Sequence, residues 1–186
     1  QFPTLPPPKN LRAILRDYQT RGMAWLFHNA KFGFGSLLAD DMGLGKTIQI
    51  ISLLLIFKQQ QMLGKPALIV VPTSLLNNWQ REIAKFAPDL KVALYHGQKR
   101  SLDKTEADVW LTSFGLVRRD VSQFETQNWS LLTVDEAQNI KNPHVAQTKA
   151  VKKIKADYKI ALTGTPVENH LSDYWSILDL LMPGLL

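Results

Sequence analysis

Residues 40–47, Asp-Asp-Met-Gly-Leu-Gly-Lys-Thr, constrain this chain more than any other stretch. They stand between an apolar run at 36–39 and an apolar segment at 48–55 that is typical of a helix. A strand, a glycine-rich turn, Gly-Lys-Thr and a helix form the context that a phosphate-binding loop requires. Backbone N–H groups of such a loop surround phosphate oxygens, and the helix N-terminus adds its positive dipole end. Lys46 would then reach the β- and γ-phosphates, and the Thr47 hydroxyl would bind Mg²⁺.

Position 40 departs from the general pattern of these loops. That pattern has a glycine separated from the Gly-Lys pair by four residues, and this chain has Asp40 there. A chance Gly-Leu-Gly turn at a strand–helix junction would explain the same residues. A second chemical motif is therefore needed to decide between the two interpretations.

Asp135-Glu136-Ala137-Gln138 provides a second motif, directly after the apolar segment 130–134. A carboxylate at Asp135, at the end of a strand, would help to hold the Mg²⁺ of a bound nucleotide, directly or through water. Glu136 could orient and deprotonate a water in line with the γ-phosphate. Without the loop at 40–47, a solvated acidic turn would be the better interpretation. With that loop, the two motifs together indicate a nucleotide site.

Thr163-Gly164-Thr165 forms a third motif, after the last apolar segment at 158–162. Its threonine hydroxyls could sense whether a γ-phosphate is present and transmit that state to other parts of the protein. Gln138 could hydrogen-bond either this loop or the waters around the γ-phosphate. All three motifs follow apolar strands, and the ligand crevice of an open α/β sheet lies beyond the carboxyl ends of its strands.

The hydrophobic pattern predicts an α/β fold in which strands alternate with helices. Several strands are apolar on both faces, which favours a mostly parallel sheet covered by helices on both faces. Asp17 is expected to cap part of the first helical segment, although Gly22 argues against one unbroken helix there, and Thr73 or Ser74 is expected to cap the third. The expected strands are 36–39, 67–71, 91–95, 108–112, 130–134 and 158–162. The expected helices are 11–30, 48–60, about 75–87, a short one from 113, 144–154 and 171–181.

The 186 residues suit one domain, and the net charge of +6 fits a polyanionic partner only weakly. Six lysines lie between positions 137 and 161 against one acid, Asp157. Nucleic-acid contact and an ordinary solvated surface explain this asymmetry equally well. The absence of cysteine excludes disulfides and thiolate metal sites, and none of the four histidines is assigned to a metal. No apolar stretch reaches the ~20 residues needed to cross a bilayer, so no membrane partner is expected.

Five motifs together resemble those of the SWI/SNF-type ATPases, double-stranded-DNA translocases of helicase superfamily two. They appear in the order of that family and cover nearly the whole chain. The family's loop reads Asp-Glu-Met-Gly-Leu-Gly-Lys-Thr, which makes Asp40 an expected residue and leaves Asp41 as a small departure. Gln138 stands where many members carry histidine. The motifs are Leu-Arg-Asp-Tyr-Gln at 15–19, the loop at 40–47, Val-Pro-Thr-Ser-Leu-Leu-Asn-Asn-Trp at 71–79, Asp-Glu-Ala-Gln at 135–138, and Leu-Thr-Gly-Thr-Pro-Val-Glu-Asn at 162–169.

The resemblance implies a RecA-like P-loop domain that binds ATP and Mg²⁺. In this family pattern Gln19 contacts adenine, Asp135 and Thr47 hold Mg²⁺, and Lys46 and Glu136 are catalytic. The pattern also places Thr73, Asn78, Thr112 and Ser113 near the DNA backbone. Independently of the resemblance, Thr163, Gly164 and Thr165 are the residues expected to take part in motor coupling. The nucleotide-binding set that it implies is Gln19, Asp41, Met42, Gly43, Leu44, Gly45, Lys46, Thr47 and Gln138.

The expected function is that of a DNA-dependent ATPase lobe that, with a second RecA-like lobe, moves along duplex DNA and remodels DNA-bound proteins. A strand-separating helicase lobe and a nucleotide-regulated protein-docking module remain as alternatives. The expected organisation is a proline-rich linker at 1–10, the lobe at 11–182, and the start of a connection to the second lobe at 183–186. The short connections favour a bacterial or archaeal, cytoplasmic protein, and a eukaryotic member would be nuclear.

Overall fold

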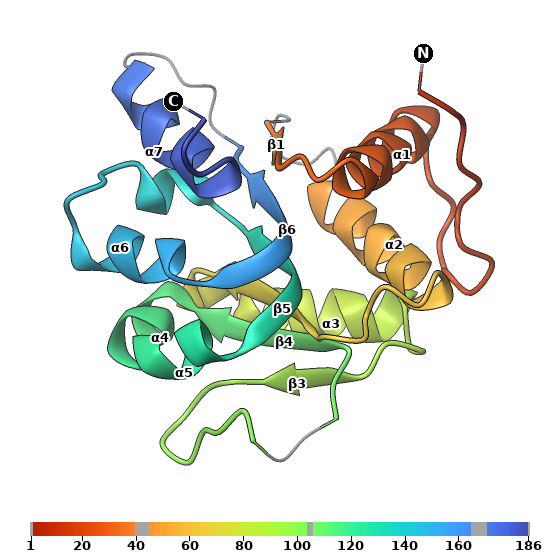
Figure 1. The fold of residues 1–186 in the computed structure, drawn as a ribbon. Coiled ribbons are helices and arrows are strands. Elements are labelled where there is room, and N and C mark those ends of the chain that lie inside the picture. The colour runs from red at the N-terminus through yellow and green to blue at the C-terminus, as the bar shows by residue number, and fades with distance from the viewer. Residues whose placement is uncertain (1, 40–44, 104–105, 165–170, 186) are drawn as a thin grey trace.

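The computed structural model describes residues 2–39, 45–103, 106–164 and 171–185. Its centre is one sheet of six strands in the order β1-β6-β5-β2-β4-β3, and every neighbouring pair is parallel (Figure 1). The predicted α/β class and the parallel sheet are confirmed. The strands are β1 Ser36–Leu38, β2 Ala67–Val71, β3 Val92–Leu94, β4 Val109–Ser113, β5 Asn128–Val134 and β6 Lys155–Leu162.

Helices cover both faces of this sheet. The α-helices are α1 Asp17–Lys31, α2 Lys46–Gln59, α3 Leu76–Phe86, α4 Phe114–Arg119, α5 Val121–Thr126, α6 Ala146–Lys152 and α7 Leu171–Leu181. Two short 3₁₀ turns, η1 Thr73–Leu75 and η2 Ala137–Ile140, follow β2 and β5. Among the described residues, no helix is both long enough and apolar enough to span a membrane.

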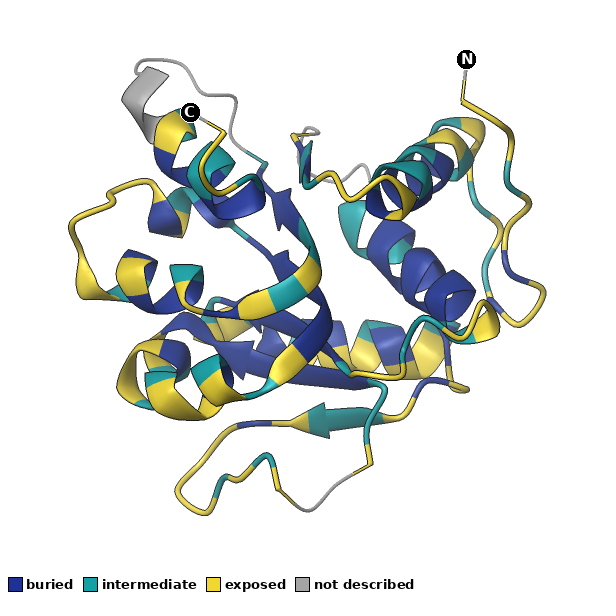
Figure 2. Ribbon diagram, in the orientation of Figure 1, coloured by how far each residue is buried: buried dark blue, intermediate teal, exposed yellow. Residues whose placement is uncertain are grey.

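Two hydrophobic cores follow from the side-chain alternation of the strands. In β2, Ala67, Ile69 and Val71 pack with α1, α2 and α3, while Leu68 and Val70 pack with α4 to α7. All five β2 residues are fully buried, which explains the uninterrupted apolar run that predicted this strand. Figure 2 shows the central strands as the most buried part of the molecule, between two helical layers.

Three predicted helix starts are wrong. The segment 11–30 becomes helical only at Asp17, and its N-cap is Arg16 rather than Asp17. Thr73 and Ser74 do not cap α3, because the Leu75 N–H donates to the Pro72 carbonyl at 2.9 Å and closes a 3₁₀ turn instead. The helix expected at 144–154 is shorter, Ala146–Lys152.

Gly22 does not interrupt α1, although the sequence suggested that it could. A Cβ at this position would lie 2.0 Å from the side-chain oxygen of Gln49 in α2. The glycine therefore lets α1 and α2 approach closely, which is a packing reason for a residue that costs about 1 kcal/mol in a helix interior. This approach brings the N-terminus of α1 beside the N-terminus of α2.

Candidate nucleotide-binding site

The N-terminus of α2 follows Gly45, whose backbone is left-handed with φ 75° and ψ 45°. Only glycine adopts this conformation without a steric penalty. A Cβ here would also lie 2.3 Å from Nε2 of Gln19, so the end of that side chain would have to move aside. Lys46 and Thr47 begin the helix and are half-buried. The first turn of a 14-residue helix thus carries the lysine and hydroxyl that a phosphate site needs.

Gln19 lies in the first turn of α1 and is buried at 9% exposure. Its side-chain oxygen accepts a hydrogen bond from the Arg16 N–H at 2.9 Å, which leaves its nitrogen turned toward Gly45. The side chain that was expected to contact adenine therefore lies directly against the last glycine of the phosphate loop. Gln19 and Gly45 are 26 positions apart in the sequence, and the packing of α1 against α2 brings them together.

Asp135 follows the last residue of β5 and is 8% exposed. Both carboxylate oxygens accept hydrogen bonds, Oδ2 from the indole N–H of Trp79 at 2.8 Å and Oδ1 from the Glu136 N–H at 2.8 Å. Burial raises the pKa of the Asp135 carboxyl, while these two donors and the nearby Lys46 act to lower it. The carboxylate is thus held in place at the edge of the sheet.

Glu136 has a left-handed backbone with φ 50° and ψ 54°, which is rare for a non-glycine residue. This conformation turns the chain sharply after β5, so that Asp135 and Glu136 both line the same cavity. Strained backbone of this kind is concentrated at functional sites, where the surrounding structure holds it. The Glu136 carbonyl accepts from the backbone and the side chain of Asn139, which stabilises the turn.

A chain of side-chain hydrogen bonds leads from Glu136 to β6. The Gln138 amide donates to the Glu136 carboxylate, and the Thr163 hydroxyl donates to the Gln138 oxygen at 3.2 Å. The sequence left two partners open for Gln138, the loop that begins at Thr163 and the waters around the γ-phosphate. The structure shows a hydrogen bond with Thr163. Gly164 follows Thr163 at the same sheet edge. Because β5 and β6 are parallel neighbours, their carboxyl ends bring these residues together.

One cavity of about 440 Å³ joins these elements. Its walls come from the start of α2, from α3, and from the end of β5. Glu82 adds a third carboxyl group to the lining, and burial raises its pKa, opposed by Lys85 and Arg81. The lining residues are Gly45, Lys46, Thr47, Ile48, Leu75, Asn78, Trp79, Glu82, Phe86, Asp135 and Glu136.

The residues of this cavity fit a magnesium ion that is bound mainly through nucleotide phosphates and water. Mg²⁺ prefers hard oxygen ligands and takes one or two from the protein in such sites. Asp135 and Thr47 offer a carboxylate and a hydroxyl to the same space. Across the described ranges, no group of three His, Cys, Asp or Glu side chains could form an all-protein metal site. The donor set therefore suits an ion that arrives with a nucleotide.

Two residues of this cavity were missed as site residues. Trp79 was expected to be core, and it is 1% exposed, but it also donates to Asp135. Glu82 lies one turn further along α3, with the Asn78 amide 3.4 Å from its carboxylate. The helical spacing of Asn78, Trp79 and Glu82 puts them on one face of α3, but nothing local in the sequence indicates that this face meets β5.

The four residues expected near DNA are placed differently from one another. Thr73 is exposed, whereas Asn78 is half-buried in the wall of the cavity. Thr112 is fully buried, and its hydroxyl donates to the Tyr95 carbonyl at 3.0 Å. Ser113 is buried at the N-cap of α4, where its hydroxyl accepts from the Leu116 N–H. In this conformation only Thr73 of the four offers its side chain freely to a large partner.

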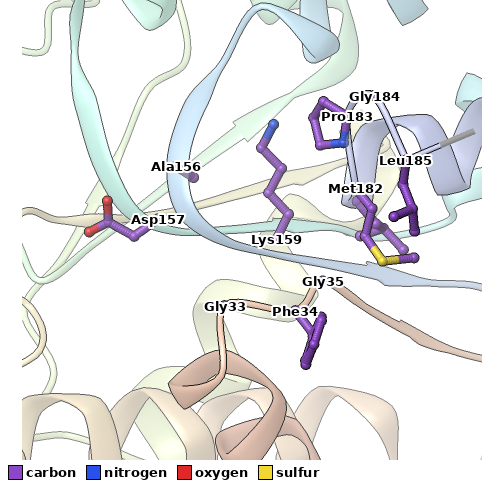
Figure 3. A pocket seen from close by; sticks show the side chains of 11 residues that line it. Gly33, Phe34, Gly35, Ala156, Asp157, Lys159, Met182, Pro183, Gly184 and Leu185 are labelled. Carbon is purple, nitrogen blue, oxygen red and sulfur yellow. The ribbon is translucent and has the colours of Figure 1, made fainter.

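The lysine-rich segment does not form one uniform basic surface. Lys152 pairs with Asp179 at 2.9 Å. Lys159 extends from β6 into a separate cavity of about 430 Å³ between residues 33–35 and 181–185 (Figure 3). Burial lowers the pKa of the Lys159 amine, an effect that Asp179 opposes. These two lysines are therefore partly engaged by the fold, and only part of the lysine excess predicted from the sequence reaches solvent.

Several expected site residues lie outside the described residues. They are Asp41, Met42, Gly43 and Leu44 of the phosphate loop and Thr165 of the third motif. The described parts of both motifs, 45–47 and 163–164, lie at the carboxyl edge of the sheet, since β1 and β6 are parallel neighbours.

Comparison with known proteins places this arrangement in a family. The model of the SNF2-related domain matches residues 18–186. The SWI2/SNF2 ATPase core of Sulfolobus solfataricus in complex with dsDNA superposes with a TM-score of 0.93 at 47% identity, over 100% of this chain and 39% of that chain. A second structure, of the Sulfolobus solfataricus SWI2/SNF2 ATPase core domain, superposes with a TM-score of 0.90 at 45% identity, over 100% of this chain and 38% of that chain.

Among curated proteins, YwqA of Bacillus subtilis, provisionally named an ATP-dependent helicase/translocase, is 47% identical over 183 residues. That alignment covers 95% of this chain and 20% of the relative. Helicase SWR1 of Debaryomyces hansenii is 42% identical over 97% of this chain and 12% of the relative. The chain thus spans only about a fifth or less of the length of these relatives. By its motifs, its fold and these matches, the chain belongs to the SNF2-related family and corresponds to the first RecA-like lobe of a SWI2/SNF2-type ATPase core.

Proposed function

We propose that this lobe binds ATP with Mg²⁺ and duplex DNA and, together with a second RecA-like lobe, hydrolyses ATP to translocate along DNA and remodel protein–DNA complexes. One observation carries this proposal. Lys46 and Thr47 at the start of α2 share a cavity of about 440 Å³ with Asp135 and Glu136 at the end of β5. A phosphate-binding helix terminus and an acidic pair thus face one another, as phosphoryl transfer requires.

The residues of the cavity have separate roles in this proposal. Lys46 and the N-terminus of α2 bind the phosphates, and Mg²⁺, held by Thr47 and Asp135, would neutralise charge on them. Glu136 orients a water and accepts its proton. Gln138 connects Glu136 with Thr163, so the state of the acidic pair reaches the end of β6. Gln19, whose amide lies against Gly45, would read a base next to the phosphates.

DNA binding and remodelling rest on the family rather than on the described side chains. The Sulfolobus core that superposes on this chain was solved with dsDNA. Chromatin-remodeling ATPase INO80 of Candida albicans is 36% identical over 98% of this chain and 14% of the relative. A net charge of +6 is compatible with a polyanion. Translocation on duplex DNA is therefore the activity that we assign to the full-length motor.

The deciding experiment measures ATP hydrolysis by the full-length protein with and without duplex DNA. We expect duplex DNA to stimulate turnover, and Glu136→Gln to lower kcat by about 10²- to 10⁴-fold while nucleotide still binds. Glu106→Gln makes the same chemical change at an exposed site and should leave kcat unchanged. An ATP hydrolysis rate that is the same with and without DNA would contradict the proposal, as would full activity of the Glu136→Gln variant.

Two further measurements separate this function from its alternatives. In a strand-displacement assay we expect no unwinding, since the proposed motor moves along duplex DNA without separating its strands. Unwinding would indicate a helicase lobe instead. The isolated lobe should hydrolyse ATP negligibly, since the second lobe of such motors supplies arginines that stabilise charge in the transition state. Arginines in this role raise the rate by about 10³- to 10⁵-fold. A full-length protein that binds nucleotide but never hydrolyses it would favour a protein-docking module.

A further inference from the structure

We propose that Trp79 is a positioning residue for Asp135, and that its indole N–H holds the carboxylate in the orientation in which it binds Mg²⁺. This inference rests on the proposed function, since it concerns the same cavity. Trp79 lies in α3 and Asp135 at the end of β5, 56 positions away. Their hydrogen bond, 2.8 Å long and buried, is thus a direct link between a helix and the acidic motif.

The geometry around Asp135 leaves the carboxylate little freedom. Trp79 donates to Oδ2 and the Glu136 N–H donates to Oδ1, so the two oxygens are held by donors from different elements. If only the backbone donor remained, the carboxylate could rotate about its χ2 angle, a broad torsion for aspartate. A tryptophan at this position therefore does more than fill the core, because it fixes the second oxygen.

The choice of donor is informative. An indole N–H can donate but not accept, and it carries no formal charge. It therefore binds the carboxylate without competing with the ion for its charge, as a lysine or an arginine would. Partners that orient metal-binding side chains in this way commonly change metal affinity 10- to 100-fold when they are removed.

Trp129 shows what a purely structural tryptophan looks like in the same protein. It is also 1% exposed, in the core on the other face of the sheet. Its indole N–H donates to the backbone carbonyl of Phe124 at 3.2 Å. Both tryptophans thus bury a ring and satisfy one N–H, but only Trp79 donates to a residue of the candidate site. This pair offers a matched control for the same chemical substitution.

The test compares Trp79→Phe with Trp129→Phe in the full-length protein. Each variant keeps an aromatic ring and removes one buried indole donor. Electron paramagnetic resonance of Mn²⁺, a probe that replaces Mg²⁺, measures metal binding in the presence of ADP. We expect Trp79→Phe to weaken Mn²⁺ binding about 10-fold or more and Trp129→Phe to change it less than about 2-fold. Binding of ADP in the presence of a chelator should be the same in both variants.

The possible outcomes separate the two proposals. If the wild-type protein shows no metal-dependent nucleotide binding, the proposed function itself fails. If the wild type binds Mn²⁺ with ADP and the two variants behave alike, Trp79 is structural only and this inference is overturned. An equal loss of ADP binding with and without metal in Trp79→Phe would also overturn it, because that result indicates a general distortion of the cavity.

A second measurement does not depend on whether Trp79→Phe folds. A 5-fluorotryptophan introduced at position 79 alone reports its surroundings by ¹⁹F NMR in the otherwise unchanged protein. We expect its resonance to shift when Mg²⁺ is added to the ADP-bound protein, whereas a label at position 129 should not respond. If Mn²⁺ binding is demonstrated and the resonance at position 79 does not shift on addition of Mg²⁺, the proposed positioning of Asp135 by Trp79 is refuted.

Discussion

The hydroxyl of Thr163 donates to the side-chain oxygen of Gln138 at 3.2 Å, across the gap between the ends of β6 and β5. The amide of Gln138 in turn donates to Glu136. Gln138 therefore connects Thr163 of the third motif directly to the acidic motif. This hydrogen bond is a specific contact through which Thr163 would act in the predicted coupling.

Removing the Thr163 hydroxyl should weaken the coupling between ATP turnover and movement on DNA. In the full-length protein, Thr163→Val keeps the side-chain shape and loses the donor to Gln138. Loss of one hydrogen bond, worth up to about 1.4 kcal/mol, would lower the ratio of coupled to uncoupled turnovers by up to about 10-fold. We therefore expect the distance travelled per ATP to fall by up to the same factor. Parallel translocation and ATPase assays measure this ratio. Thr163→Ser keeps the hydroxyl as a control, and equal coupling in both variants would contradict this role.

Gly45→Ala should damage the start of α2. Alanine at φ 75° costs about 1–2 kcal/mol in backbone energy, and its Cβ would lie 2.3 Å from Nε2 of Gln19. We therefore expect a loss of about 1–2 kcal/mol in the free energy of unfolding, together with weaker nucleotide binding. Urea denaturation and a nucleotide titration measure the two effects. Gly64→Ala, at a glycine with open space around it, provides the control. A Gly45→Ala variant as stable as Gly64→Ala would show that the loop accommodates a side chain.

Gly35→Ala tests the contact between the start of β1 and α7. A Cβ at Gly35 would lie 2.5 Å from the carbonyl oxygen of Leu181, a backbone atom that cannot move aside alone. We expect a loss of about 1–3 kcal/mol, which is typical of overpacking. Gly115→Ala, in α4 with no neighbour within 4 Å, should instead stabilise by about 0.5–1 kcal/mol. Thermal unfolding compares the two, and a stabilised Gly35→Ala variant would refute the predicted clash.

Asp120 should contribute stability that disappears in acid. Its carboxylate accepts from Arg100 at 2.5 Å and from the Tyr95 hydroxyl at 2.9 Å. The Arg100 bond, and less strongly the Tyr95 bond, lower the pKa of Asp120 below its ordinary value of about 3.8, against an opposing effect of burial. A carboxyl with a lowered pKa in the folded state stabilises the protein above its unfolded pKa. That contribution is lost as the pH falls through the folded pKa.

The corresponding variant is Asp120→Asn. We expect it to be less stable than the wild type at pH 7, and the difference in the free energy of unfolding to narrow below about pH 4. Urea denaturation at a series of pH values measures this difference. Asp157→Asn removes the ion pair with Lys65, whose side chains are about half exposed, so its effect should be small. A difference for Asp120→Asn that does not change with pH would contradict the assignment.

The motifs, the fold class and most elements could be read from the chain itself. The strand Ala67–Val71 and the helix Leu171–Leu181 have the predicted bounds. Each depends on apolar residues that are close in sequence, so local pattern is enough to reveal it. The phosphate loop and the acidic motif are recognisable for the same reason, because their chemistry is carried by consecutive residues.

The contacts between those motifs were decided only in three dimensions. Gln19 lies against Gly45, Trp79 donates to Asp135, and Gln138 accepts from Thr163. These partners are 25 to 56 positions apart, and which side chains meet depends on strand order and on how each helix packs on the sheet. Residues 40–47 and the acidic motif at 135–138 thus predicted a nucleotide site together, from sequence alone. Only the parallel sheet, by bringing the ends of β1, β6 and β5 to one edge and packing α3 beside them, determined which residues surround it.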